Sequence, residues 1–142
     1  MREQEFIHWE PEHSIGIAII DSQHKELVNF VNSLISLSNV SLADRKKYTQ
    51  KILSAAENHM ENHFDTEMEI LSKTRYEKLA DHKKEHDKLL GKIAEIQHEL
   101  EREEENIDFY YVAITLKEYF LSHILLYDKE AIDFFKEGIN SF

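Results

Sequence analysis

The sequence predicts an all-α fold, an up-down-up-down antiparallel four-helix bundle with an extended N-terminal arm, on three observations. Three glycines and one proline are the only helix-breaking residues among 142, so long uninterrupted helices are expected. Apolar residues recur every three or four positions over four long segments, and no segment alternates with period two. The connections between these segments are short, which favours antiparallel neighbours. The length is typical of one domain, and we expect residues 1–142 to form a single one.

Each element has its own signal. Residues 1–20 lack a helical period and contain Trp9 and Pro11, so they are predicted to form an arm along the bundle. Asp21 and Ser22 are favourable helix N-caps and predict where the first helix starts. The four helices are expected at roughly residues 22–38, 42–72, 76–103 and 107–137.

Composition narrows the function. The net charge of -11 argues against nucleic acid and anionic membranes as partners. Without cysteine, disulfides, thiolate metal sites and a cysteine nucleophile are excluded. The N-terminus has no apolar signal region and no segment is long and apolar enough to span a membrane, so a cytoplasmic location is expected. Nothing in the sequence indicates a protein partner.

Histidines and carboxylates occupy positions on the apolar stripes of all four predicted helices. Two pairs, His63 with Glu67 and His82 with His86, are spaced by four residues, which stacks them on one helix face. A lone inward histidine is more often a hydrogen-bonded core residue than a ligand. The candidate metal ligands, taken as a set, are His24, His63, Glu67, His82, His86, His123 and Asp128.

Burying five imidazoles and two carboxylates among leucine and isoleucine is costly unless each is hydrogen-bonded or coordinated. Neutral imidazole and carboxylate are ligands that suit iron. Seven donors exceed the four that close a zinc site, but they suit two octahedral ions that share bridging groups. The pattern therefore predicts a dinuclear metal centre inside the bundle.

The same residues resemble the hemerythrin family, in particular its bacterial single-domain type. The resemblance rests on the Trp9 arm, the run Asp21-Ser22-Gln23-His24-Lys25-Glu26-Leu27, the run His63-Phe64-Asp65-Thr66-Glu67, and the spaced pairs His82/His86 and His123/Asp128. It extends over nearly the whole chain. Myohemerythrin is a known example of the up-down-up-down bundle, so the predicted fold repeats one already described.

The resemblance implies a role for each candidate. His82, His86 and His123 would bind one iron, and His24 with His63 would bind the other, which keeps an open position for dioxygen. Glu67, Asp128 and an oxo or hydroxo group would bridge the two iron ions, which alternate between Fe2+ and Fe3+. The function implied is reversible dioxygen binding for transport, storage or delivery, and not enzymatic catalysis.

The step from His123 to Asp128 departs from the helical period. Five residues along an ideal α-helix turn a side chain about 140° away. Asp128 would therefore reach the site only from the edge of the stripe or through local widening of the helix. Spacing alone leaves Tyr127 and Glu130 as rivals, and the resemblance favours Asp128.

Two further features concern oxygen chemistry. An apolar pocket beside the open iron is expected, and the residues that flank the ligands are candidates for its wall: Phe64, Phe120, Ile124 and Leu125. His59 lies one turn before His63, where relatives often carry tyrosine. Three roles stay open for it: an orienting hydrogen-bond partner, an alternative ligand or a core residue. As a titratable group it could also supply a proton that favours oxidation of the site.

Two other functions compete with oxygen carriage. The first is a di-iron oxidase or peroxidase, although ferritin-like enzymes use carboxylate-rich sites with Glu-x-x-His pairs. The one such pair in a predicted helix, Glu95 with His98, falls largely off the core stripe. The second is an oxygen-sensing or iron-sensing module that acts through a partner protein.

Overall fold

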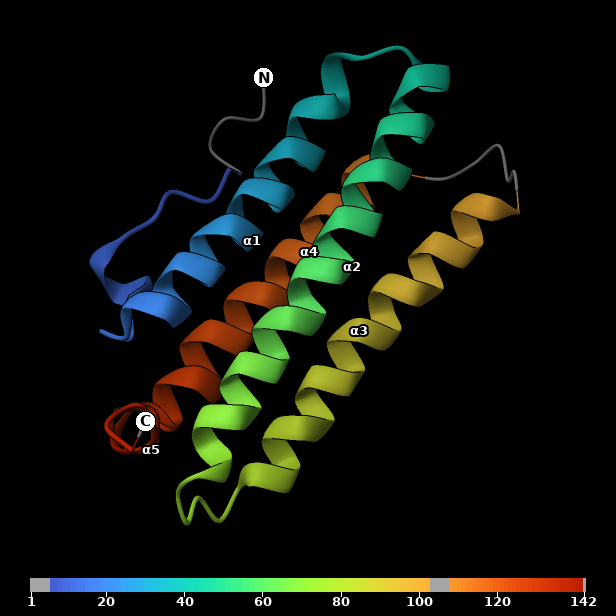
Figure 1. Cartoon of the computed structure of the whole chain (residues 1–142). Coiled ribbons are helices and arrows are strands. Elements are labelled where there is room, and N and C mark those ends of the chain that lie inside the picture. The colour runs from blue at the N-terminus through green and yellow to red at the C-terminus, as the bar shows by residue number, and fades with distance from the viewer. Residues whose placement is uncertain (1–5, 103–107, 142) are drawn as a thin grey trace.

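The computed structural model describes residues 6–102 and 108–141, apart from the side chain of Ser38. Four helices form the bundle: α1 (Ala18–Ser36), α2 (Leu42–Ser72), α3 (Leu79–Glu101) and α4 (Phe109–Ser122). Figure 1 shows them side by side with alternating direction, and α1 packs against both α2 and α4 while α3 packs against α2. The predicted antiparallel four-helix bundle is confirmed.

The first helix begins earlier than predicted, at Ala18 rather than at Ser22. The N-cap position is Ile17, whose side chain cannot cap. Asp21 lies inside the first turn, and its carboxylate accepts hydrogen bonds from the backbone N–H groups of Ile15 and Gly16. The residue predicted to cap the helix therefore fixes the preceding loop, which turns at Gly16 with a φ of 78°.

The other helix bounds differ less. Helix α2 runs over Leu42–Ser72 as predicted, with the Ser41 side chain accepting from the Asp44 N–H as a cap. Helix α3 begins at Leu79 rather than at residue 76, after a turn. The predicted ends at residues 103 and 107 lie outside the described residues. The arm contains one short 3-10 turn, η2 (Pro11–His13).

The C-terminal helix is not one continuous α-helix. After α4, residues His123–Asp128 form a π-helix, η4, and the chain continues as α5 (Ile132–Ile139). Helix α5 packs on the end of α2. A Cβ at Gly138 would collide with the carbonyl oxygen of Ile70, so only glycine allows this approach.

Two separate apolar clusters fill the bundle. The larger cluster includes Leu27, Phe64, Leu89 and Ile124, and the smaller one includes Ile20, Ile70, Leu71, Ala131 and Phe135. On α1 and α2, and again along the chain from η4 to Ala131, the candidate ligands fall between members of the two clusters. The layer of candidate ligands is thus enclosed between the two apolar clusters. Within the described residues, no helix combines the length and apolar character needed to cross a membrane.

Candidate metal centre

The seven predicted ligands come from four elements and meet in the interior. Helix α1 contributes His24, α2 contributes His63 and Glu67, α3 contributes His82 and His86, and η4 contributes His123 and Asp128. Every one of them is at most 2 % exposed. The helical spacing of four residues turns both members of each α2 and α3 pair inward, as the sequence predicts.

Donor atoms of these residues form two overlapping groups, and within each group the atoms lie within 4.8 Å of one another. One group consists of His24, His63, Glu67, His123 and Asp128, and the other of Glu67, His82, His86, His123 and Asp128. The two carboxylates and His123 belong to both groups. Two neighbouring cation positions that share bridging oxygens are the simplest interpretation of this arrangement.

Glu67 lies at the centre of the cluster. Its Oε1 is 3.3 Å from His82 Nε2, 2.9 Å from His86 Nε2 and 3.2 Å from His123 Nε2. Its Oε2 is 3.3 Å from His63 Nε2 and 3.6 Å from His24 Nε2. Each oxygen thus faces a different group of imidazoles, which is the geometry of a bridging carboxylate.

Asp128 also faces both groups. Its carboxylate oxygens are 2.8 Å from His24 Nε2, 3.1 Å from His82 Nε2 and 3.0 Å from His123 Nε2. The π-helix explains its reach, because i→i+5 bonding stacks residues five apart and so aligns Asp128 with His123. Of the two routes that the sequence left open for Asp128, reach from the edge of the stripe or local widening of the helix, the structure shows widening at this segment.

The two rivals for that position point elsewhere. Tyr127 is half-buried and lines a surface hollow. Glu130 is exposed and pairs with Lys78. Neither belongs to the groups of donors that could bind a cation.

The unpaired atoms in the cluster fit a metal ion. Both oxygens of Asp128, Oε2 of Glu67 and Nε2 of His24 and His63 are buried, and none has a hydrogen-bond partner among the described residues. Buried polar atoms are rarely left without a partner. Cations placed among these nitrogen and oxygen atoms would satisfy all of them, so the donor set fits two metal ions.

Electrostatics in the metal-free cluster favour ionised carboxylates. Burial alone would raise the pKa of Glu67, but the surrounding imidazoles, His63 and His123 first, hold this pKa well below its ordinary value. Burial and the Glu67 charge likewise oppose ionisation of Asp128, and His123 and His24 lower its pKa nonetheless. Both groups are therefore available as anionic ligands at neutral pH.

The imidazoles divide into two sets. Burial lowers the pKa of each, yet the adjacent carboxylates of Asp128 and Glu67 raise the pKa of His24 and His82 to about 9. The same two carboxylates raise the pKa of His123 to about 10. For His86, burial dominates and lowers the pKa to about 4, and burial also lowers the pKa of His63. Metal binding must displace protons from the first set.

His59 lies outside both groups of donors. Its Nε2 donates to the backbone carbonyl of Gln23 at 3.1 Å, and its ring lies 5.9 Å from that of Phe30. The Gln23 side chain in turn contacts His63, with 2.7 Å between Oε1 and Nδ1. Gln23 therefore links His59 to the predicted ligand His63, because it contacts one through its backbone carbonyl and the other through its side chain. The sequence does not predict Gln23, because a single polar residue beside a ligand gives no periodic signal.

The predicted oxygen-pocket residues have different surroundings. Phe64 stacks on His86 with ring centroids 3.9 Å apart, Phe120 meets His24 edge-on at 6.3 Å, and Ile124 is fully buried. Leu125 is 37 % exposed, so its predicted place in an enclosed wall is wrong. The π-helix accounts for this, since the widened turn directs Leu125 outward while Ile124 faces the core.

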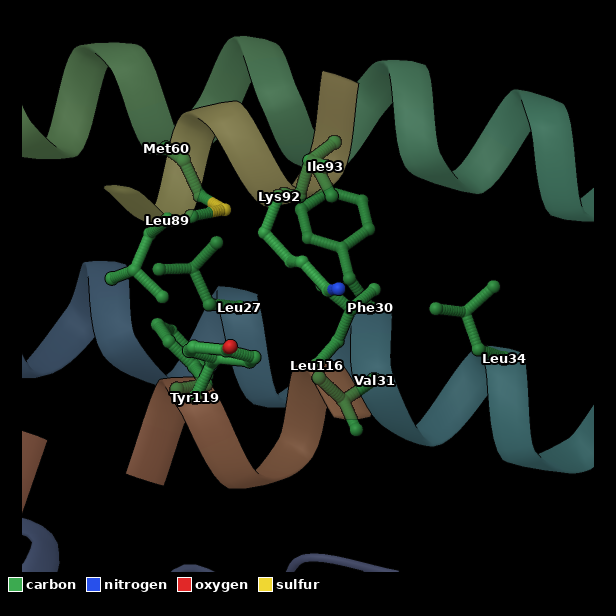
Figure 2. A pocket seen from close by; sticks show the side chains of 12 residues that line it. Leu27, Phe30, Val31, Leu34, Met60, Leu89, Lys92, Ile93, Leu116 and Tyr119 are labelled. Atoms are coloured by element: carbon green, nitrogen blue, oxygen red, sulfur yellow. The ribbon is translucent and has the colours of Figure 1, made fainter. Parts of the chain in front are cut away.

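An apolar cavity of about 30 Å³ lies along the bundle from the cluster, and none of the seven candidate ligands is part of its lining. Phe120, which packs against His24, is part of its wall, as is Leu27 on the next turn of α1. Figure 2 shows side chains from all four bundle helices converging on it, among them Leu27, Met60, Leu89 and Leu116. Such a space can accommodate a molecule as small as dioxygen.

The fold and the site together define a metal-binding four-helix bundle. Residues 15–134 match the family described as hemerythrin HHE cation binding domain. The chain belongs to the hemerythrin family. Hemerythrins bind a di-iron centre and are oxygen-binding proteins rather than enzymes, so this chain is a di-iron, oxygen-binding protein in the general sense of its family.

Individual proteins to which the chain is similar support the same family assignment. The chain is 33% identical over 132 residues to a bacteriohemerythrin of Clostridium acetobutylicum, with 88% of this chain and 98% of the relative covered. It is 24% identical to a bacteriohemerythrin of Stenotrophomonas maltophilia over 94% of this chain and 84% of the relative. A crystal structure of a hemerythrin mutant superposes with a TM-score of 0.80 at 25% identity, covering 91% of this chain and 96% of the other.

Proposed function

We propose that this protein binds dioxygen reversibly, as a carrier, store or delivery protein, at a di-iron centre with the seven residues as ligands. The observation that carries the proposal is the pair of overlapping donor groups, buried and sharing Glu67, His123 and Asp128. The chemistry the iron ions supply is electron transfer to and from dioxygen. The residues of the chain hold the ions and control access to them.

Distances between the imidazole rings support an assignment of the ligands to the two ions. His24 and His63 bind one iron, and His82, His86 and His123 bind the other, with Glu67 and Asp128 between them. The ring of His123 lies 5.0 Å from that of His86 and 5.6 Å from that of His82, but 6.2 Å from those of both His24 and His63. His123 therefore belongs with the α3 histidines, and the iron at His24 and His63 has fewer protein ligands.

The apolar cavity supports reversible binding at the less-coordinated iron. Its wall includes Phe120, which packs against His24, and the lining is apolar apart from the side chains of Lys92 and Tyr119. His59, one turn before His63 on α2, directs its Nε2 proton to the Gln23 carbonyl. These features favour carriage over oxidase or peroxidase chemistry.

Iron loading with oxygen cycling tests the proposal. The reduced protein is loaded with Fe2+ anaerobically, iron per chain is measured, and the visible spectrum is recorded through repeated cycles of air and anaerobic buffer. We expect two irons per chain and a spectrum that returns to its starting form in each cycle. One iron per chain would contradict the dinuclear site. Irreversible conversion to a ferric spectrum in the first cycle would contradict reversible binding and favour an oxidase.

A further inference from the structure

We propose that Gln23 is a positioning residue for the metal ligand His63. Its side-chain oxygen accepts the Nδ1 proton of His63 and so leaves Nε2 of that ring free for the metal. The inference rests on the proposed function, since it concerns one of the proposed iron ligands. It assigns a role to a residue that coordinates no metal itself.

The hydrogen-bond network fixes which way the Gln23 amide points. The hydroxyl of Thr66 donates to the carbonyl of Asn62 at 2.9 Å, so its oxygen can only accept from the amide. Gln23 Nε2 lies 3.2 Å from that oxygen and donates to it. The other end of the amide, Oε1, then faces His63 Nδ1 at 2.7 Å and must accept a proton from it. The Nδ1–H tautomer of His63 follows from these contacts.

The other four imidazoles of the site lack such a partner. The Nδ1 atoms of His24, His82, His86 and His123 are buried, and none makes a hydrogen bond within the described parts of the chain. Among the described residues, His63 is therefore the one ligand whose second nitrogen is engaged by a neighbouring side chain. A hydrogen bond at this atom orients the ring and makes the coordinating nitrogen more basic.

Gln23 is fixed at its backbone as well. His59 donates from Nε2 to the Gln23 carbonyl at 3.1 Å, and this bond joins α2 to α1. His59 and His63 lie one turn apart on α2, so one helix binds Gln23 at both its main chain and its side chain. His59 thus supports the residue that orients the ligand.

The location of this network gives it a consequence. His63 binds the iron that has two rather than three histidine ligands. With fewer protein donors, this ion depends more strongly on the geometry of each. Loss of an orienting partner of a metal-bound histidine lowers metal affinity by roughly 10–100-fold. We expect the effect of Gln23 to fall on this iron and to leave the other nearly unchanged.

The experiment titrates the metal-free protein with Co2+ and compares Gln23→Leu with wild type. Gln50→Leu on α2, a glutamine outside the site, is the matched control. In Gln23→Leu, the dissociation constant of the more weakly bound Co2+ ion should rise by roughly 10–100-fold. The dissociation constant of the more tightly bound ion should stay within about twofold of the wild-type value. Gln50→Leu should leave both constants unchanged.

Two further measurements separate positioning from folding. The Nδ1–H signal of His63, observed by NMR of 15N-histidine protein loaded with Zn2+, should be slow to exchange in wild type and lost in Gln23→Leu. Gln23→Glu keeps an acceptor at the same place, so it should restore both the signal and the weaker constant. This rescue keeps the proposal testable even if Gln23→Leu folds poorly.

The outcomes distinguish this inference from the proposed function. If wild type binds fewer than two Co2+ ions, the dinuclear site itself fails. If wild type binds two and Gln23→Leu binds both with wild-type constants, the positioning role is overturned. Equal weakening of both ions without rescue by Gln23→Glu would also overturn it, because that result indicates a general structural defect.

Discussion

The two halves of the metal centre present the same kind of ligand in different surroundings. On one side, which consists of His24 and His63 and which we call the cavity side, His24 packs edge-on against Phe120 of the cavity wall and His63 is fixed by a hydrogen bond to Gln23. On the aromatic side, which consists of His82, His86 and His123, Phe64 stacks on His86 and Phe135 lies 6.0 Å from His82. Aromatic rings therefore lie beside both sides, but the close parallel stacking is at His86 and the side-chain hydrogen bond is at His63. The comparison shows that the same kind of ligand is held by a polar contact on one side and by ring packing on the other.

Removing the bridge should damage both halves at once and gives the largest expected effect. Glu67→Gln replaces a carboxylate that faces all five imidazoles with a neutral amide of the same shape. We expect iron content, measured by atomic emission, to fall from two ions per chain to one or none. Asp65→Asn, an exposed neighbour on α2, should retain both irons. Two tightly bound irons in Glu67→Gln would show that this residue is not a bridge.

Removing the stacked ring tests the aromatic side. Phe64→Ala deletes a buried side chain that packs on His86 and should lower the free energy of unfolding by about 3–5 kcal/mol. Urea unfolding of the metal-free protein measures this directly. Phe30→Ala removes a half-buried ring and should cost less. A loss below about 1 kcal/mol for Phe64→Ala would mean that ring packing does not support this half.

The pH dependence of the metal-free protein tests the charges shared by both halves. The pKa values of His24 and His82 are raised to about 9 and that of His123 to about 10. The stability they contribute is fully present below their ordinary value near 6.5 and is lost as pH rises through these folded values. Because the pKa values of His63 and His86 are lowered, these two residues titrate at lower pH and do not oppose the loss of stability at high pH.

Thermal melts with a chelator, from pH 7 to pH 10, should therefore show a falling Tm for the metal-free protein. The iron-loaded protein should change much less over the same range, because coordinated imidazoles have no proton to lose at Nε2. Metal binding near pH 7 should release protons, measured by calorimetry in two buffers of different ionisation enthalpy. A Tm that rises with pH for the metal-free protein would contradict the assigned shifts.

Narrowing the cavity tests the other side and should have the smallest effect on stability. Ala56→Val adds methyl groups at the cavity wall and should lower the free energy of unfolding by at most the usual overpacking cost of about 1–3 kcal/mol. It should nonetheless slow dioxygen association in stopped-flow measurements, with the equilibrium spectrum unchanged. Ala94→Val on the exposed face of α3 is the control. Unaltered association kinetics in Ala56→Val would exclude the cavity as the route of entry.

Much of the fold and the clustering of the seven residues can be predicted because both follow helical periodicity. His63 with Glu67 and His82 with His86 read directly as one face of a helix. Asp128 is different, because a residue five positions after His123 lies on the same helix face only if the helix widens locally. Such widening is one of the two ways in which the sequence allows Asp128 to reach the site. The ligand roles themselves stay predictions until iron is measured.

The misses have a common physical cause. Asp21 matches the N-cap preference, but its carboxylate accepts bonds from the loop, and a propensity cannot distinguish those two roles. Gln23 acquires its role from a contact with a residue forty positions away. Leu125 is close to His123 in sequence, which predicts a place in the wall, whereas the widened turn directs it outward. Contacts between helices and departures from the ideal turn are not encoded in local pattern.

The π-helix also sets how the residues of α5 are rotated about the helix axis relative to α4. Deleting one residue from His123–Asp128, such as Leu126, would turn the downstream chain by about 100° relative to α4. Phe135 and Gly138 would then leave their contacts on the end of α2, where Gly138 allows close approach to Ile70. The extra residue that aligns Asp128 with His123 therefore also registers the C-terminal helix against the bundle. The length of this segment cannot change without altering both.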